Sequence, residues 1–331
     1  MRPTVLYHAT GGGLGHAVRS LSLARQLRRL VGGRHVLLLN TPFASALRAE
    51  PGVEMIVTAS QATAQEVAGL VARTIESARP DLFVVDTFPR GVGGELVRLL
   101  EGWSACPRIL IGRGLPPAYV ERFRLREFVR RHFDFVCVPG EPSPWDDLDN
   151  AARFNPFLIR DLNELPSPAE ACRLLRSPTP VVLLAGSGSS AECGEWVESI
   201  RELAGTWPAD APPLRLALPE GIPAPDDLAG RIVRHFPLMD CLPGVKLLVA
   251  SAGYNLVHEA RATRTRGLFV ARKRLYDDQG GRGQEARPTC ETILHLLATP
   301  TAPLPPIGNG ADDAARHIAT ILSRRPLESR S

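Results

Sequence analysis

Lysine is almost absent from this sequence of 331 residues. It occurs only at Lys246 and Lys273, so arginine carries nearly all of the positive charge. The formal net charge is +4, which is too small to indicate a nucleic-acid-binding protein and only weakly favours anionic ligands. Long apolar runs are also missing, because none approaches the roughly 20 residues that a membrane-spanning helix needs.

Paired cysteines are missing as well. Six cysteines are scattered along the chain with no metal or redox spacing, which predicts reduced, buried thiols of a cytosolic protein. The chain enters a strand directly, so we expect no signal peptide. The expected location is therefore cytoplasmic, or peripheral at the inner face of the membrane.

The two common nucleotide-binding motifs, GxGxxG and GxxxxGK[ST], do not occur at the N-terminus. The first predicted strand, Thr4 to Ala9, leads instead into Gly11-Gly12-Gly13-Leu14-Gly15-His16 and then a helix to about Val31. Gly13 and Gly15 allow a ligand to approach the backbone closely at a helix N-terminus. His16 lies in the first turn of that helix, where it is either a general base or a capping or packing histidine.

Strands and helices alternate through the first half, which predicts a parallel, doubly wound sheet. Asp86 directly follows the fourth predicted strand, Leu82 to Val85, and the carboxyl ends of parallel strands form the ligand-binding edge. It could bind an acceptor hydroxyl, assist His16, or simply cap the next helix.

The segment from Tyr119 to His132 is rich in arginine, with Phe123, Leu125 and Phe128 between the arginines. This pattern fits either a face that touches anionic lipid or a solvated helix with an apolar inner side. Asp147-Leu148-Asp149 resembles the metal-binding Asp-x-Asp motif of one class of transferases, but it lies in a Pro- and Asp-rich loop and is interpreted as exposed charge. We therefore predict no metal site.

A linker is predicted between Gly140 and Pro168, where prolines cluster, and the alternation then restarts. The strand Pro180 to Leu184 leads into a second glycine-rich turn and a helix from Glu192. Backbone N–H groups and hydroxyls of this turn could surround a diphosphate; the alternative is a flexible structural loop. Its candidate residues are Gly186, Ser187, Gly188 and Ser190.

The stretch from Leu247 to Gln279 contains a further strand, a small-residue turn and a helix that opens near Asn255. Glu259 lies one turn further along the same helix face, where its carboxylate could accept hydrogen bonds from a ribose diol. An ordinary βαβ unit with a solvated acidic loop is the alternative. The candidate residues here are Ser251, Ala252, Gly253, Asn255, Glu259, Asp278 and Gln279.

Taken together, these motifs resemble the MurG-like branch of the GT-B glycosyltransferases, glycosyltransferase family 28, and in one segment, Asp81 to Leu96, a subgroup of predicted bacterial glycosyltransferases. In that family the histidine of the first glycine-rich loop lies by the reacting centre, and the glutamate corresponding to Glu259 holds the ribose. Asn155-Pro156 through Arg160 resembles a linker whose arginine approaches the donor phosphates. Asp278-Gln279 resembles a pair whose glutamine contacts the donor sugar.

Phe236-Pro237-Leu238-Met239 stands in the segment where a backbone N–H would help to read a uracil carbonyl, so the resemblance places Phe236 and Met239 at the donor. Proline at 237 lacks that N–H. Gly280-Gly281-Arg282-Gly283-Gln284 also departs from the helix start that usually comes after the glutamine.

The resemblance implies an α/β protein with two Rossmann-like doubly wound domains facing across a cleft. The expected division is an acceptor domain at 1–155, a nucleotide-sugar donor domain at 156–310, and a C-terminal helix with a disordered tail at 311–331. The implied activity is metal-independent, inverting transfer of a hexose or N-acetylhexosamine from an NDP-sugar, most simply a UDP-sugar, to a hydroxyl acceptor.

We expect no cofactor, since the NDP-sugar is a co-substrate. The acceptor is unknown and could be lipid-linked, a saccharide or a small natural product, with weak peripheral membrane contact and no nucleic-acid partner. An NDP-sugar hydrolase or epimerase of the same fold, or a non-catalytic sugar-nucleotide-binding subunit, remains open.

Overall fold

The chain forms two compact α/β units in a computed structural model that describes residues 2–11, 13–47, 50–59, 61–186, 188–285, 287–300 and 305–324. The described residues of 1–44, 49–158 and 309–331 make the first unit, and those of 45–48 and 159–308 make the second. The sequence placed the boundary at 155/156, whereas the chain passes from one unit to the next between Leu158 and Ile159 and returns to the first at Asn309.

The first unit is built on a seven-stranded sheet in the order β3-β2-β1-β4-β5-β6-β7, with every neighbouring pair parallel. Its central strands are continuous apolar runs with almost no exposed surface, as expected for a sheet covered on both faces. The strands are β1 Thr4–Ala9, β2 Arg34–Leu39, β3 Val53–Val57, β4 Leu82–Asp86, β5 Arg108–Ile111, β6 Phe135–Pro139 and β7 Ala151–Phe154.

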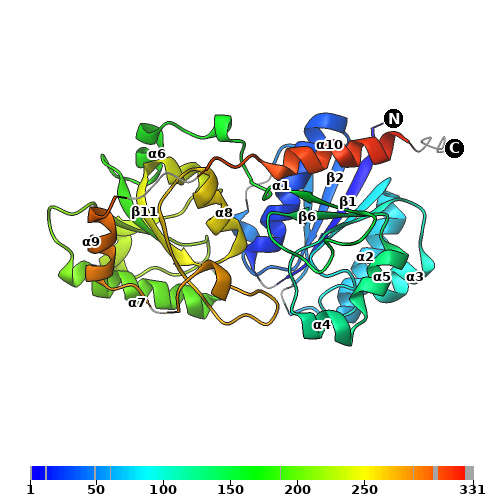
Figure 1. The fold of residues 1–331 in the computed structure, drawn as a ribbon, viewed down its shortest axis with the longest axis horizontal. Helices are drawn as coiled ribbons and strands as arrows, with labels where there is room; N and C mark the ends of the chain where they lie inside the picture. The colour runs from blue at the N-terminus through cyan, green and yellow to red at the C-terminus, as the bar shows by residue number, and fades with distance from the viewer. Residues whose placement is uncertain are drawn as a thin grey trace. The chain divides into compact units, whose positions relative to one another are not determined.

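Helices connect most of these strands, as the alternation predicted. They are α1 Leu14–Val31, α2 Ala64–Ala78, α3 Val97–Gly102, α4 Pro117–Arg122 and α5 Leu125–His132, with the short 3-10 turn η1 Ala44–Ala46. Helix α2 begins at a capping box in which Thr63 and Glu66 satisfy each other's backbone N–H groups. The last helix, α10 Gly310–Ser323, lies along α1 in Figure 1, so the C-terminal helix completes the first unit.

Two features of this unit differ from the expectation. The arginine-rich segment between Tyr119 and His132, interpreted as one helix, forms the two short helices α4 and α5, because Arg124 adopts a left-handed conformation with φ 49°. The segment Ala151–Phe154, expected to be part of a linker, is instead the edge strand β7 and pairs with β6.

The second unit contains a five-stranded parallel sheet in the order β10-β9-β8-β11-β12. Its strands are β8 Val181–Ala185, β9 Leu214–Ala217, β10 Ile232–Val233, β11 Val245–Ser251 and β12 Gly267–Val270. Its α-helices are α6 Pro168–Leu174, α7 Ser190–Thr206, α8 Tyr254–Ala262 and α9 Cys290–Ala298, and its 3-10 turns are η2 Leu162–Glu164, η3 Asp226–Arg231, η4 Leu238–Gly244 and η5 Gly280–Arg282.

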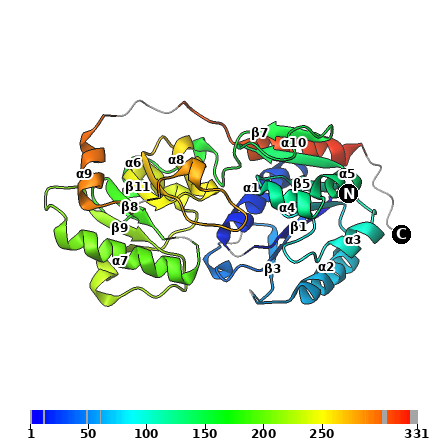
Figure 2. The ribbon, with the colours of Figure 1, turned by 60° about the horizontal axis from the view of Figure 1, so that its bottom comes forward.

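Figure 2 shows α7 on one side of the second sheet and α6 and α8 on the other. Both units are therefore Rossmann-like: a parallel sheet with connecting helices, which places the end of each strand and the start of the next helix at one edge.

The cysteines are free, and five of the six are buried while Cys290 is partly exposed. Among the helices that the structure describes, none combines the length and the apolar character needed to span a bilayer.

Candidate functional site

The first candidate site lies at the carboxyl edge of the first sheet, where β1 and β4 are neighbours. Helix α1 begins at Leu14, directly after the glycine-rich turn, and so places His16 in its first turn. Asp86 is the last residue of β4. The two side chains meet, with His16 Nδ1 2.6 Å from Asp86 Oδ2.

Arg19 and Thr87 complete this cluster, and the sequence reasoning missed both. Arg19, one turn along α1 from His16, donates from Nε to Asp86 Oδ1 at 2.9 Å and from Nη2 to Asp86 Oδ2 at 2.7 Å. Thr87 Oγ1 accepts from Arg19 Nη2 at 3.0 Å and donates to Asp86 Oδ2 at 3.0 Å. The i,i+3 spacing of His16 and Arg19 is the signal that could have revealed the arginine.

Thr87 has φ 64°, a left-handed conformation that a β-branched residue rarely adopts. Its hydroxyl contacts lie on Asp86 and Arg19, so the conformation accompanies a specific polar arrangement at the strand end. Such strained residues are concentrated at functional sites.

The charges in the cluster fix the protonation of His16. Burial alone would raise the pKa of Asp86, but the charge of Arg19 and the contact with His16 outweigh burial and hold that pKa well below its usual range. Burial lowers the pKa of His16 from 6.5, and the hydrogen bond to Asp86 opposes this only in part. At neutral pH the site therefore holds an aspartate anion, an arginine cation and a neutral imidazole.

The tautomer of His16 is determined by these states. An ionised carboxylate only accepts hydrogen bonds, so His16 Nδ1 must carry the proton that lies against Asp86 Oδ2. Arg19 Nη2 lies 3.4 Å from the same nitrogen, but this longer contact cannot compete with the 2.6 Å one. Nε2 is left with its lone pair and can accept a proton.

Gly11 makes room for the His16 ring. A Cβ at position 11 would lie 2.1 Å from His16 Cδ2 and 2.5 Å from Nε2, whereas a Cβ on Gly13 would meet nothing within 4 Å. The glycine-rich turn therefore serves two purposes: Gly11 admits the imidazole, and Gly13 leaves open space at the N-terminus of α1. Gly15 lies within the first turn of the helix.

In the second unit, the glycine-rich turn after β8 joins that strand to α7. Gly186 is buried, and a Cβ there would lie 2.7 Å from Leu218 Cδ2, so packing alone requires glycine. Gly188 has φ 106°, and Ser190 is the exposed first residue of α7. Ser187 lies outside the described residues.

The chain's own side chains occupy the N-terminus of α7. Ser189 caps the helix, and Glu192 Oε2 accepts from the Ser189 backbone N–H at 2.7 Å. Arg274 Nη1 lies 2.6 Å from Glu192 Oε1. An incoming diphosphate would therefore find a carboxylate at the backbone N–H groups of this turn and a guanidinium beside it.

The stretch from Ser251 to Glu259 is different, because two of its buried side chains, Ser251 and Glu259, form no side-chain hydrogen bond or ion pair with a described residue. The first is Ser251, which ends β11 and is 2% exposed, and its Oγ has no hydrogen-bond partner among the described residues. Ala252 is buried, and Gly253 is the N-cap of α8, with no side-chain cap hydrogen bond. Asn255 lies in the first turn of that helix.

The second is Glu259, in the second turn of α8, which is 5% exposed. No described residue forms a hydrogen bond or an ion pair with its carboxyl group. Burial, with a smaller contribution from the charge of Asp240, raises the pKa of Glu259 to about 7. A buried carboxyl without a partner is costly, and a ligand that donates hydrogen bonds to it would remove that cost.

Arg160 lies in the same unit and pairs with Asp240, the residue whose charge acts on Glu259. Its Nε is 3.0 Å from Asp240 Oδ1, and His235 Nε2 is 3.2 Å from Asp240 Oδ2. Phe236 is partly exposed, while Met239 is fully buried in η4. The predicted donor residues Arg160 and Glu259 thus share one neighbour, Asp240.

Gln279 is engaged within its own loop. Its Oε1 accepts from the Arg272 backbone N–H at 3.1 Å, and its Nε2 donates to Asp277 Oδ2 at 3.2 Å. Asp278 is exposed, and its Oδ1 accepts from the Gly280 N–H at 3.0 Å. The loop then continues into the short turn η5 instead of a full helix start.

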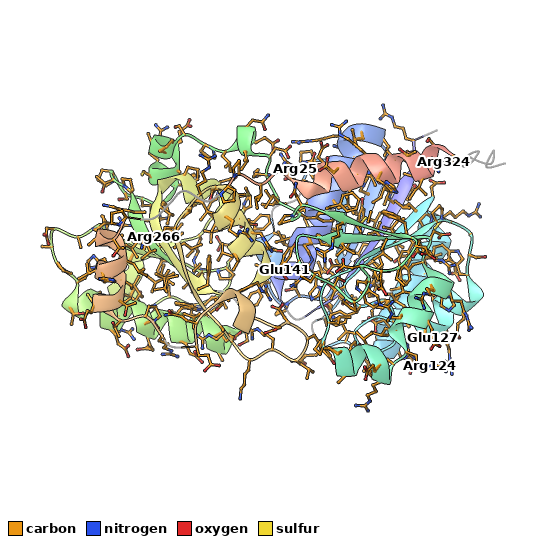
Figure 3. All side chains as sticks on the ribbon, in the orientation of Figure 1. Arg25, Arg124, Glu127, Glu141, Arg266 and Arg324 are labelled. Atoms are coloured by element: carbon orange, nitrogen blue, oxygen red, sulfur yellow. The ribbon has the colours of Figure 1, made fainter. Side chains whose placement is uncertain are left out.

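The arginine-rich segment of the first unit forms an exposed surface over α4 and α5. Figure 3 shows Arg124 and Glu127 next to one another there, and they form an ion pair at 2.5 Å. The guanidinium of Arg90 lies 5.5 Å from the ring centre of Phe123, which is 37% exposed. The inner residues of α5, such as Val129, are buried, so the helix is amphipathic as predicted.

In the part of the chain that the structure describes, no three His, Cys, Asp or Glu side chains are grouped so as to hold a metal ion.

Solved structures share this fold. A glycosyltransferase of kitacinnamycin matches with a TM-score of 0.58 at 15% identity, over 97% of this chain and 100% of its own. The glycosyltransferase SnogD from Streptomyces nogalater matches with a TM-score of 0.56 at 19% identity, over 98% and 96%. A UDP-GlcNAc 2-epimerase from Neisseria meningitidis, solved with UDP-GlcNAc bound, matches with a TM-score of 0.59 at 13% identity, over 97% and 100%.

No protein-family model matches the sequence, and no curated protein matches it. At these identities the structural likeness establishes the fold, which is that of the GT-B glycosyltransferases. The assignment to the MurG-like family 28 stays a prediction.

Proposed function

We propose that this protein is an inverting glycosyltransferase that moves a hexose or N-acetylhexosamine from an NDP-sugar to a hydroxyl acceptor. The observation that carries the proposal is the hydrogen bond between His16 Nδ1 and Asp86, which leaves a neutral imidazole with a free lone pair on Nε2. A protein that only binds a sugar nucleotide has no need of such a base.

In the proposed reaction, His16 Nε2 removes the proton of the acceptor hydroxyl as that oxygen attacks the anomeric carbon of the sugar. The new bond joins the acceptor oxygen to the anomeric carbon, and the bond from that carbon to the diphosphate oxygen breaks on the opposite face. The configuration inverts, and the nucleoside diphosphate leaves with the electron pair. Asp86 orients the ring and stabilises the imidazolium that forms.

Arg19 explains why we assign the base to His16 and not to Asp86. Its guanidinium is bound to both carboxylate oxygens, and it keeps the aspartate ionised and too weakly basic to take a proton from an alcohol. The aspartate acts through the histidine, as in other paired acid–base sites.

We assign the donor to the second unit. Glu259 supports this assignment because its carboxyl group is buried and lacks a partner among the described residues, as a site for a ribose diol requires. Ser251, with an unsatisfied hydroxyl at the end of the adjacent strand, is a second donor contact in the proposal.

The reaction as proposed uses no metal or cofactor. Charge on the leaving diphosphate would be offset by helix N-termini and by arginine. Arg160 and Arg274 are the available guanidinium groups, and each is held by a carboxylate, Asp240 or Glu192, with which the diphosphate would compete. Because Gln279 is engaged within its own loop, its contact with the donor sugar requires that loop to rearrange.

A uridine donor is the first choice, since related folds have been solved with UDP-GlcNAc and with UDP bound. The acceptor is a hydroxyl compound, which could be a saccharide, a small natural product or a lipid-linked molecule. The exposed arginines of α4 and α5 would suit a lipid-linked acceptor through weak contact with an anionic membrane.

The test is a calorimetric screen of UDP, dTDP and GDP, followed by turnover of the corresponding sugar donors. We expect one nucleotide to bind clearly more tightly than the others and its sugar to be transferred to an alcohol acceptor with inversion. Tight binding without any turnover of a matching donor would reduce the protein to a sugar-nucleotide-binding subunit.

An epimerase is the second candidate, because the epimerase from Neisseria meningitidis shares the fold as well as the glycosyltransferases do. An epimerase would return an isomer of the sugar nucleotide and release no free nucleoside diphosphate, and a hydrolase would release free sugar without any acceptor. Product analysis by NMR of the donor incubated alone separates these outcomes from transfer.

A further inference from the structure

The loop between β4 and α3, residues 87–96, lies against the His16 ring. Phe88 in this loop is 4% exposed, and its ring centre is 5.4 Å from that of His16. Phe88 also packs against Tyr119 in an edge-to-face arrangement, with ring centres 6.5 Å apart. Phe88 therefore provides part of the burial that keeps His16 neutral.

A single carboxylate holds the far end of this loop. Glu95 Oε1 accepts from the Val92 N–H at 3.2 Å, and Oε2 accepts from the Gly93 N–H at 2.8 Å. The same carboxylate reaches the end of β1, where His8 Nε2 lies 3.4 Å from Oε1 and Thr10 Oγ1 donates to Oε1 at 3.4 Å. The side chains of His8 and Glu95 are both almost completely buried.

The loop folds around this carboxylate. Gly91 has φ 79°, and a Cβ there would lie 2.2 Å from Glu95 Cδ. The Gly91 N–H donates to the Phe88 carbonyl at 2.9 Å, which closes the turn that presents Phe88. Glu95 thus ties the turn at Phe88 to the end of β1, from which the chain runs into the glycine-rich turn before His16.

We infer that Glu95 is a positioning residue, which acts through the loop it closes and through Phe88 to keep the His16 imidazole buried and neutral. It does not touch the reacting atoms. The effect of Glu95 on turnover rests on the proposed function, but its effect on the His16 ring does not.

The other charged groups around His16 remain in place when the loop loosens. They are Asp86 on β4, Arg19 on α1, and Arg113 after β5. Since burial is the largest cause of the lowered pKa of His16, admission of water should raise that pKa while Asp86 continues to favour the charged ring.

Two glycines of the loop provide a matched pair of variants. Gly91 and Gly94 have nearly the same left-handed φ, 79° and 84°, so alanine causes similar backbone strain at each. Only at position 91 does the new Cβ enter the space of the Glu95 carboxylate, because a Cβ at 94 meets nothing within 4 Å. Glu95→Gln gives a third variant with an unchanged shape.

The experiment is an NMR titration of the His16 ring in the wild type, in Gly91→Ala, in Gly94→Ala and in Glu95→Gln, with His16→Ala to assign the signal. We expect the pKa of His16 to rise by roughly one unit in Gly91→Ala and in Glu95→Gln and to stay unchanged in Gly94→Ala. Equal titration of His16 in all folded variants would overturn the inference, whether or not the protein transfers sugar.

With a sugar donor in hand, the acid limb of the pH profile of kcat should move by the same amount, and the donor KM should not change. If the pKa of His16 rises in Gly91→Ala and Glu95→Gln but neither the wild type nor any variant shows turnover, the positioning role stands and the proposed function fails.

Discussion

The carboxyl edges of the two sheets are built alike, but their polar side chains differ in whether they have hydrogen-bond partners. At the first, His16, Arg19, Asp86 and Thr87 bind one another within a closed cluster. At the second, Glu259 and Ser251 are buried without partners among the described residues. A closed cluster is preorganised for proton transfer, whereas unsatisfied buried groups are suited to an incoming ligand.

The largest effect should come from breaking the closed cluster. His16→Ala removes the base, so kcat should fall about 10²- to 10⁴-fold, the usual contribution of a general base. Donor affinity, measured by calorimetry, should stay within about twofold of the wild type, because the donor is assigned to the other sheet edge. Equal kcat in the two proteins would remove His16 from the reaction.

A substitution at Glu259, on the edge of the second sheet, should affect donor binding instead. Glu259→Gln replaces two acceptor oxygens of a carboxylate with a neutral amide, and hydrogen bonds to charged groups contribute about 1.5–3 kcal/mol. We expect donor affinity to fall roughly 10- to 100-fold with little change in kcat at saturating donor. Glu192→Gln is the control at the neighbouring helix, and it should bind the donor at least as tightly as the wild type because it removes a competing carboxylate.

The glycine-rich turn before α1 offers a finer comparison. Gly11→Ala places a Cβ into the His16 ring, so the ring must move away from Asp86, and we expect kcat to fall about tenfold. Gly13→Ala adds the same methyl group where it meets no protein atom, so the contact between His16 and Asp86 should stay intact and kcat should fall less than in Gly11→Ala. If both alanines act equally, Gly11 has no special role in placing the histidine.

The smallest effect concerns pH. The pKa of Glu259 is about 7, and a ribose diol donates to the ionised form, so affinity for a UDP-sugar should rise up to about tenfold from pH 6 to pH 8. A UDP-sugar is the right probe because the terminal phosphate of free UDP itself titrates near pH 6. Affinity of Glu259→Gln for the same donor should be independent of pH in this range.

The Glu259 carboxyl group also makes the free energy of unfolding depend on pH. Since its folded pKa lies above the ordinary value of 4.5, the folded state binds the proton more tightly than the unfolded state. Its stabilising effect is complete below about pH 4.5 and is lost as the pH rises through about 7, a change of about 3 kcal/mol. Urea unfolding of the unliganded protein should show this slope, and Glu259→Gln should lack it.

Much of the fold could be predicted because parallel strands are marked by buried apolar runs. The strand Thr4–Ala9 has the predicted bounds, and the strands predicted at Leu82–Val85 and Pro180–Leu184 lie within one residue of β4 and β8. The two-unit α/β architecture is confirmed. The edge strand β7 was missed because Ala151–Phe154 is short and half exposed, without an apolar run. The break between α4 and α5 was missed because a left-handed arginine has no sequence signature.

The site was predictable only in part. His16, Asp86 and Glu259 stand beside glycine-rich or strand-end motifs, which local patterns reveal. Arg19 stands three residues after His16, but its contact with Asp86, 67 residues away in the chain, has no local signature. The same holds for the contact of Glu95 with Thr10, 85 residues away. Gln279 was predicted at the donor sugar, but its amide is bound within its own loop, which only coordinates can show.

Hydrogen exchange with and without saturating UDP tests the central claim most directly, because it reports separately on the two sheet edges. We predict that UDP slows exchange of the amides from Ser251 to Ala262 and leaves those from Thr4 to Arg19 nearly unchanged. Protection confined to the first unit, or none at any nucleotide concentration, would contradict the assignment of the nucleotide to the site at Glu259 and of the base to the cluster at His16.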